Sequence, residues 1–387
     1  MKKWIKRIFL SLMSLLAVAV VLLIISGNQQ VLYGLGKTYL IGKSKPDIDD
    51  KKFFEVSTIA ADKPEPWPMH SKFYQQKLDS KYLALIDSME TTAFLVIQND
   101  SIVFEQYWDG FDAKTTANSF SMAKSFTAIL IGIAIDEGFI KNMDQPVSDF
   151  IPELKSEPKK MLTIRHLLEM SSGIPYGESY NSPFGYMAKA YYGKNLIEET
   201  MKFRVEQEPG SLWKYEGGNS VLLGMIIQRS TGRTVSDYFF QKIWSCVGAE
   251  NDAYWNLDKQ GGMEKTFSGF YATARDFAKM GKLYLNNGKN GADTIVNPEF
   301  VKACLTPNMV PDETGVPCDW YGLHWWLGKH EGQDFYSCRG MRGQYIVVLP
   351  DINMIIVRLG HHQNKERVEH MPPDLFWYID MAKSMEQ

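Results

Sequence analysis

The stretch Ser119-Phe120-Ser121-Met122-Ala123-Lys124-Ser125-Phe126 opens an apolar segment. Apolar side chains recur at helical spacing as far as Ile133, and Gly138 is a stop signal. The pattern predicts a helix that begins near Ser121. Such a helix would carry Ser121 and Lys124 on one face, one turn apart.

This pair of side chains suits an acyl-transfer nucleophile. A serine hydroxyl attacks poorly until a nearby base takes its proton. A lysine can be that base when burial and neighbouring cations lower its pKa. The helix N-terminus adds positive potential beside the attacked carbonyl. Ser-x-x-Lys is a short pattern, however, and on its own it is more often a capped helix with an exposed lysine.

The composition is that of a globular protein. Of the 387 residues, 45% are hydrophobic and 22% are charged, which suits a large core in one domain or two intermingled ones. The formal net charge is -3, without the basic excess typical of nucleic-acid-binding proteins, so no nucleic-acid partner is expected. Aromatic residues are frequent and favour a packed core, while an aromatic cleft is also compatible.

Residues 1–30 form a separate unit. A basic head, Met1–Arg7, precedes the uncharged run Ile8–Ser26, which is about long enough to span a bilayer. No clear small-x-small cleavage site and no cysteine follow the run. We therefore expect a membrane anchor with its basic end in the cytoplasm and the body in the periplasm or outside the cell. A cleaved signal peptide is the alternative.

The remaining chain divides into a linker and one large domain. Charges and prolines in residues 31–68 argue against a packed element and predict a stalk. Residues 69–387 then form the domain, with a mostly helical lobe at about residues 125–290. Four cysteines are present and show no metal spacing. A disulfide between Cys304 and Cys318 and four free thiols both stay open.

Strand patterns lie at both ends of the domain. They are Phe94–Ile97 and Ile102–Trp108, joined at Asn99-Asp100, and later Tyr321–Gly328, Gln344–Leu349 and Met354–Leu359. Helices are expected at Asp79–Met89, from Thr163, at Ser220–Ser230, at Thr273–Leu285 and from Pro373. The early and late strands most simply form one antiparallel sheet. The predicted class is α+β, and the cleft between sheet and lobe is the default site.

Six motifs follow one another in this chain: Ser121-Met122-Ala123-Lys124; Thr163–Leu168 with Ser171-Ser172-Gly173; Pro209–Tyr215; Leu222-Leu223-Gly224; Tyr321–Trp326; and Gly340–Gln344. In this order they resemble the serine beta-lactamase and penicillin-binding-protein superfamily, over roughly residues 75–385. The class C-like branch, which includes esterases, D-amino-peptidases and 6-aminohexanoate-dimer hydrolases, is the more similar. The resemblance implies a beta-lactamase-like fold.

By this resemblance Tyr215 faces the Ser121–Lys124 pair. A phenol beside a lysine can exist partly as phenolate or can relay a proton to the leaving group. The usual pattern is Tyr-x-Asn, but Gly217 stands where the asparagine is expected. Asn219, two residues on, or a water molecule would then supply the amide contact. This departure resembles the aminohexanoate-dimer-hydrolase branch.

A third motif, usually Lys-Thr-Gly or His-x-Gly on a strand, is replaced by Cys338-Arg339-Gly340. Gly340 fits a strand that the substrate approaches closely. With the usual cation missing, Arg339 or Arg342 would bind a substrate carboxylate, or both are simply solvated. The resemblance implies an oxyanion hole made of the Ser121 and Met341 amides. Tyr180 could line the cleft, although packing explains it equally well.

Together these observations predict an anchored serine hydrolase. Ser121 would attack an ester or amide, with Lys124 and Tyr215 managing the proton and an acyl-enzyme as intermediate. The expected partner is a small-molecule ester, amide or peptide substrate, and no metal or organic cofactor is required. The alternatives are a peptidoglycan-directed D,D-peptidase or beta-lactamase, and a catalytically silent binding protein. The sequence does not show whether Lys124 or Tyr215 is the first base that takes the Ser121 proton.

Overall fold

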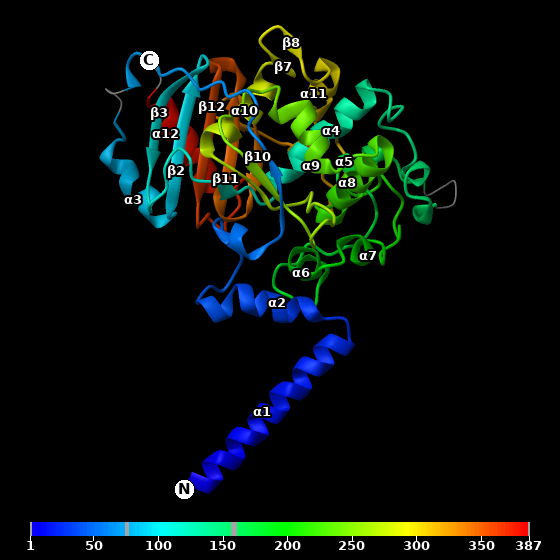
Figure 1. The fold of residues 1–387 in the computed structure, drawn as a ribbon. Helices are drawn as coiled ribbons and strands as arrows, with labels where there is room; N and C mark the ends of the chain where they lie inside the picture. Colours follow the sequence, from blue (N-terminus) through cyan, green and yellow to red (C-terminus); the bar gives the residue numbers. More distant parts are fainter. Residues whose placement is uncertain (1, 74–76, 156–160, 386–387) are drawn as a thin grey trace.

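The computed structural model describes residues 2–73, 77–155 and 161–385 (Figure 1). Its central element is an antiparallel six-stranded sheet with the order β3-β2-β12-β11-β10-β9. The strands are β2 (Thr91–Gln98), β3 (Ser101–Tyr107), β9 (Trp326–His330), β10 (Gln333–Gly340), β11 (Gln344–Leu349) and β12 (Met354–Gly360). The pairing of β2 with β12 joins the two ends of the domain, which confirms the predicted sheet and the α+β class.

Both faces of this sheet are buried, because alternate side chains of each central strand enter two different cores. In β2, Leu95 belongs to the core shared with the helical lobe, whereas Phe94 and Val96 belong to the core on the other face. Helices α3 (Ser80–Ser88) and α12 (Pro373–Lys383) cover that second face, and α10 (Ala274–Leu285) covers the first (Figure 1). The sheet therefore serves as a rigid wall for the lobe.

The lobe is built on two helices that are apolar nearly all round. These are α4 (Met122–Asp136) and α8 (Gly217–Thr231), which pack against each other. Shorter helices surround them: α5 (Ile164–Leu168), α6 (Tyr186–Tyr192), α7 (Leu196–Thr200), α9 (Val235–Phe239) and α11 (Pro298–Cys304). A helix that is apolar on every face has to be buried. In α8 every side chain from Gly217 to Ile227 is buried, so the amphipathic helix expected at Ser220–Ser230 is instead a core helix.

A second, four-stranded sheet with the order β1-β5-β6-β4 closes the lobe. Its strands are β1 (Val56–Ile59), β4 (Ala117–Asn118), β5 (Ala253–Asn256) and β6 (Phe270–Ala272). A two-residue ribbon, β7 (Lys289–Asn290) with β8 (Asp293–Thr294), lies at the surface. The short β4 leads directly into the Ser121 turn, so this small sheet determines where the turn lies.

Residues 31–68, expected to be a stalk, instead pack against the domain. Strand β1 pairs with β5, and Ile48, Ile59 and Trp67 are at most 4% exposed. The charges that suggested a solvated segment have partners: Lys43 pairs with Asp47 and Asp49. The compositional argument failed because those charges are satisfied locally while the apolar residues between them reach the core.

At the C-terminal side, one predicted strand is displaced. The expected strand at Tyr321–Gly328 is instead β9 at Trp326–His330, because residues up to Trp325 turn inward. His324 has a φ of 60°, which breaks an extended run. Strand β11 has the predicted bounds, α12 begins at the predicted Pro373, and Asn99 and Asp100 both adopt positive φ in the hairpin turn.

Before this domain stand two helices, α1 (Lys2–Ile25) and α2 (Gln29–Lys37). Helix α1 has a mean hydropathy of 3.1 over its most apolar window and none of that window is buried, so it is long and apolar enough to cross a membrane. In Figure 1, α1 extends away from the body and α2 lies against it.

Replacing Trp67 by alanine tests the packing of residues 31–68. The indole is 4% exposed and its Nε1 donates to the carbonyl of Arg275 at 3.0 Å. We expect the free energy of unfolding to fall by about 3–5 kcal/mol, as for a buried large-to-small change. Urea unfolding of the full chain in detergent measures it. Trp377→Ala, at a position that is 37% exposed, is the control and should cost clearly less. A loss no larger than the control's would restore the stalk interpretation.

Candidate active site

The Ser121 turn is held by the small sheet on one side and by α4 on the other. The Ser119 amide donates to the Phe270 carbonyl of β6 at 2.7 Å, and Asn118 Oδ1 accepts from the Phe120 amide at 2.9 Å. Between them Phe120 is buried and adopts a φ of 44°. A non-glycine residue in this region costs of order 1–3 kcal/mol and persists only where its surroundings enforce it. Here that constraint places Ser121 at the first turn of α4.

Lys124 lies in the same first turn of α4 and extends toward the serine. Its ammonium nitrogen Nζ lies 2.9 Å from Ser121 Oγ and 3.0 Å from the carbonyl oxygen of Phe267. The lysine is 1% exposed, and in the described part of the chain it forms no ion pair with a carboxylate. Its nitrogen is therefore held against the serine by the Ser121 hydroxyl and the Phe267 carbonyl, without a charged partner in the described residues.

A neutral histidine supports the other side of α4. Burial, with a smaller contribution from Lys124, lowers the pKa of His324 to about 3, against the bond to the Leu168 carbonyl. Its Nδ1 lies 2.8 Å from that carbonyl, so Nδ1 carries the proton and Nε2 accepts from Ser220 at 2.9 Å. The His324 carbonyl in turn accepts from Ser125 at 2.6 Å. This network ties α4, α5 and α8 together behind the lysine.

Tyr215 stands over the lysine at the start of α8. Lys124 Nζ lies 4.9 Å from the centroid of its ring, which is within cation–π range. The ring is half-buried and packs against Trp326 at 5.5 Å and Tyr321 at 6.2 Å between centroids. The structure therefore brings together the three side chains that the motifs singled out as catalytic.

Tyr180 completes this group from the loop that precedes α6. The residue is 56% exposed, and its hydroxyl donates to Glu178. Burial of the hydroxyl raises the pKa of Tyr180 well above 10, with further contributions from Glu178 and Tyr215, whereas a hydrogen bond with Ser121 opposes them. Tyr180 thus lies beside the nucleophile, as the sequence suggested.

Glu178 is the site residue that sequence reasoning missed. One carboxylate oxygen accepts from Tyr180, and the other accepts from the Gly217 amide at 2.6 Å. A side chain at position 217 would crowd this carboxylate, since an added Cβ would lie 3.1 Å from it. The missing asparagine of the Tyr-x-Asn pattern was the available signal: without a side chain at Gly217, the Glu178 carboxylate has room to approach the backbone N–H there.

The end of β10 lies against the Ser121 turn. An added Cβ at Gly340 would lie 2.1 Å from the Ser119 carbonyl oxygen. Glycine is therefore required here by the close contact between the backbones of β10 and the Ser121 turn, and not by the approach of a substrate. The contact brings half-buried Met341 to the same edge of the sheet. Among the described residues neither the Ser121 nor the Met341 amide donates to a protein group, which leaves both N–H groups available.

Three other predicted contacts are not supported. Asn219 is 0% exposed and its amide donates to the Met170 sulfur at 3.5 Å, so it faces the core behind Tyr215 and cannot replace the missing asparagine. Arg339 stacks over Trp326 at 3.4 Å and donates to the His370 carbonyl at 3.0 Å, so its guanidinium supports the aromatic wall. Arg342 donates to the carbonyls of Pro46 and His361, which is a structural role.

Other polar groups lie away from this constellation. His330, Glu331 and Asp380 could approach one metal ion, but His330 already pairs with Asp380 and Glu331 with Lys383. A hollow of about 630 Å³ lies at the far end of α4, where Glu137 is bound by Lys242 and Tyr238. All four cysteines are free thiols, and burial raises the pKa of Cys304 to about 12 and keeps it inert.

Comparison with known proteins agrees with this geometry. The family model described as Beta-lactamase matches residues 80–374. The chain belongs to the beta-lactamase family. Within it, the chain is 26% identical over 291 residues to a 6-aminohexanoate-dimer hydrolase of Paenarthrobacter ureafaciens, covering 70% of this chain and 72% of that protein. This membership makes the protein a relative of hydrolases.

Solved structures of the family share the fold. One from Bacillus anthracis, provisionally named a 6-aminohexanoate-dimer hydrolase, has a TM-score of 0.73 at 23% identity and covers 88% of this chain and 93% of that one. A family VIII carboxylesterase has a TM-score of 0.63 at 20% identity, over 86% of this chain and 100% of that one. Both likenesses concern the fold.

Glu216, next to Tyr215, provides a pH test of the site. It is 1% exposed, both carboxyl oxygens lack a side-chain partner, and it lines a cavity of about 60 Å³. Burial, and then the Glu178 charge, raise its pKa from 4.5 to about 7, against Lys214. Below pH 4.5 the Glu216 carboxyl is protonated in both the folded and the unfolded state. Between pH 4.5 and 7 the carboxyl stays protonated in the folded state but is ionised in the unfolded state. The free energy of unfolding therefore falls as pH rises through this range.

Glu216→Gln removes this titration without changing shape. Relative to wild type, the variant should gain about 3 kcal/mol in the free energy of unfolding at pH 8 and little at pH 4.5. Urea unfolding at both pH values measures the difference. Glu313→Gln, whose side chain is 66% exposed, is the matched control and should shift neither value. A constant difference between wild type and Glu216→Gln at both pH values would contradict the prediction.

Proposed function

We propose that the protein is a serine hydrolase that cleaves an ester or small amide through an acyl-enzyme on Ser121. The observation that carries the proposal is the buried Lys124 Nζ, 2.9 Å from Ser121 Oγ, with no carboxylate paired to it in the part of the chain that the structure describes. The names of relatives in the family, a 6-aminohexanoate-dimer hydrolase and a carboxylesterase, support the same reaction class.

The proposed chemistry uses groups that lie together. Lys124 or Tyr215 takes the Ser121 proton while Oγ forms a bond to the substrate carbonyl carbon. The Ser121 and Met341 amides donate to the oxygen that becomes negative. The same proton then passes to the leaving alcohol or amine as its bond to carbon breaks. A water molecule then gives a proton to the base as its oxygen bonds to the acyl carbon; the bond from that carbon to Ser121 Oγ breaks, and the base returns the proton to Oγ.

Charge favours uncharged substrates over beta-lactams and D-alanyl peptides, which bring a carboxylate. The lysine or histidine that would meet such a carboxylate is replaced by Cys338, whose thiol is buried and has its pKa raised by burial. Arg339 is engaged with Trp326 and the His370 carbonyl. Glu178, bonded to Tyr180 beside the nucleophile, adds a negative charge that repels an anion.

The α1 helix places this hydrolase, in our proposal, on the outer side of the cytoplasmic membrane. The basic residues Lys3 to Arg7 occupy one end of α1, and the domain follows the other end. Positive residues favour the cytoplasmic side, so the domain would face the periplasm or the exterior.

A fluorophosphonate probe tests the nucleophile. Wild-type protein should become labelled at Ser121, Ser121→Ala should lose the label, and Tyr215→Phe should be labelled about 10²-fold more slowly because proton transfer is impaired. Mass spectrometry of the labelled peptide gives the position, and circular dichroism checks folding. Ser125→Ala, which removes a neighbouring hydroxyl on α4, is the control and should stay labelled. A folded protein that takes no label would support the silent binding protein instead.

Glu178→Gln tests the proposed selection by charge. The amide keeps the shape, its oxygen can still accept from the Gly217 amide while its NH2 donates to the Tyr180 hydroxyl oxygen, and the negative charge is removed. Acylation by benzylpenicillin should therefore rise by about tenfold while hydrolysis of a neutral ester changes little. The ratio of the two rates is the measurement. Glu198→Gln, an exposed change on α7, is the control. Rapid, long-lived acylation of wild type by penicillin would instead favour the D,D-peptidase.

A further inference from the structure

The chain exposes an apolar surface immediately after α1. Leu35, Tyr39, Leu40 and Ile41 are 41%, 65%, 81% and 43% exposed, and the last three form the short helix η1 (Tyr39–Ile41). Leu40 is the most exposed large hydrophobic side chain in the described residues. We call these four residues the α2–η1 patch. Only residues 26–28 separate α1 from α2, so the patch lies close to the end of the apolar helix.

The α2–η1 patch has the chemistry of a membrane interface. Helix α1 spans 24 residues, about 36 Å at 1.5 Å per residue, and none of its apolar window is covered by the rest of the chain. A bilayer core of about 30 Å matches that length, with the basic residues at the opposite end. A tyrosine flanked by aliphatic side chains is typical of the headgroup region, where a ring can be buried and its hydroxyl hydrated.

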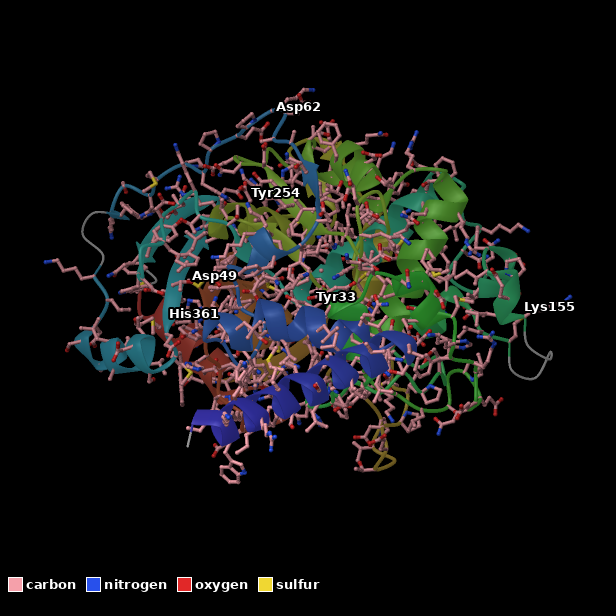
Figure 2. All side chains as sticks on the ribbon, turned by 60° about the horizontal axis from the view of Figure 1, so that its bottom comes forward. Tyr33, Asp49, Asp62, Lys155, Tyr254 and His361 are labelled. Carbon is pink, nitrogen blue, oxygen red and sulfur yellow. The ribbon has the colours of Figure 1, made fainter. Side chains whose placement is uncertain are left out.

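The same helix α2 is fastened to the loop that carries Tyr180. Gln30 Nε2 donates to the Pro183 carbonyl at 3.1 Å, and Gly34 packs against the Tyr192 ring of α6. Figure 1 shows α2 directly beside α6, at the end of the molecule from which α1 leaves. In Figure 2, turned to bring that end forward, α1 and α2 lie in front of the body. The loop of residues 177–185 is therefore on the side of the anchor.

We propose that the α2–η1 patch rests in the outer surface of the membrane that α1 crosses, and that it holds the Tyr180 loop at the lipid surface. On that loop Tyr180 and Phe184 are 56% and 55% exposed. The substrate is then an amphiphilic ester or amide whose apolar tail stays in the bilayer while its carbonyl reaches Ser121. This substrate class rests on the proposed hydrolase; the membrane contact of the patch does not.

The contact is tested with the full chain in phosphatidylcholine nanodiscs. Cys246 is the only cysteine that is not buried, so Cys246→Ser gives a background for labelling. An environment-sensitive fluorophore on Leu40→Cys should emit at shorter wavelength and be quenched about twofold or more by nitroxides on the lipid chains. Asp62→Cys is an exposed control, labelled in Figure 2 at the edge away from α1. Equal quenching at both positions would overturn the proposal.

The substrate class is tested with two esters that share a leaving group, 4-methylumbelliferyl butyrate in solution and the palmitate dissolved in the nanodisc. Replacing Tyr39, Leu40 and Ile41 together by serine should slow palmitate hydrolysis by about tenfold and leave the butyrate rate unchanged, because only the supply from the bilayer is impaired. If wild type and the triple-serine variant hydrolysed the palmitate at equal rates, the proposed amphiphilic substrate would be contradicted. No hydrolysis of either ester by wild type would contradict the proposed hydrolase, while the quenching still decides the membrane contact.

Discussion

A buried amine that bridges a serine hydroxyl and a backbone carbonyl is the constraint on which this molecule depends. Lys124 reaches Ser121 and Phe267 from the first turn of a helix that has almost no wet face. Desolvating an amine is costly, so the surroundings have to be rigid enough to keep water out. The six-stranded sheet, the core helices α4 and α8 and the His324 network all serve that exclusion.

Where the pattern is local, the sequence predicted the structure well. The helix that begins at Ser121, the hairpin turn at Asn99 and the strand Gln344–Leu349 follow from periodicity and turn residues within a few positions. The packing of β1 onto β5 did not follow, because the two strands lie about two hundred positions apart and the charges around β1 resemble a linker. Pairing over such a separation carries no local signature.

The site shows the same division between local and distant information. Ser121, Lys124 and Tyr215 were proposed from ordered motifs, and the structure places Lys124 against both of the other two. The role of the substituted Gly217 was not predictable, since its meaning depends on a carboxylate 39 residues earlier in the chain. Asn219 was misassigned because the first turn of α8 directs it toward Met170 instead of the nucleophile. A motif identifies residue types reliably, but orientation is a property of the packed helix.

The pairing of β1 with β5 also determines what happens if the protein is cut from its anchor. A protease acting between α1 and α2 would release a domain whose small sheet stays complete. A cut after Ile59 would instead let β1 depart and leave the N–H and C=O groups of β5 unpaired along an edge. Such an edge can recruit a strand from another molecule. Release by a cut just after α1 would thus be harmless, whereas release by a cut just after β1 would lead to aggregation.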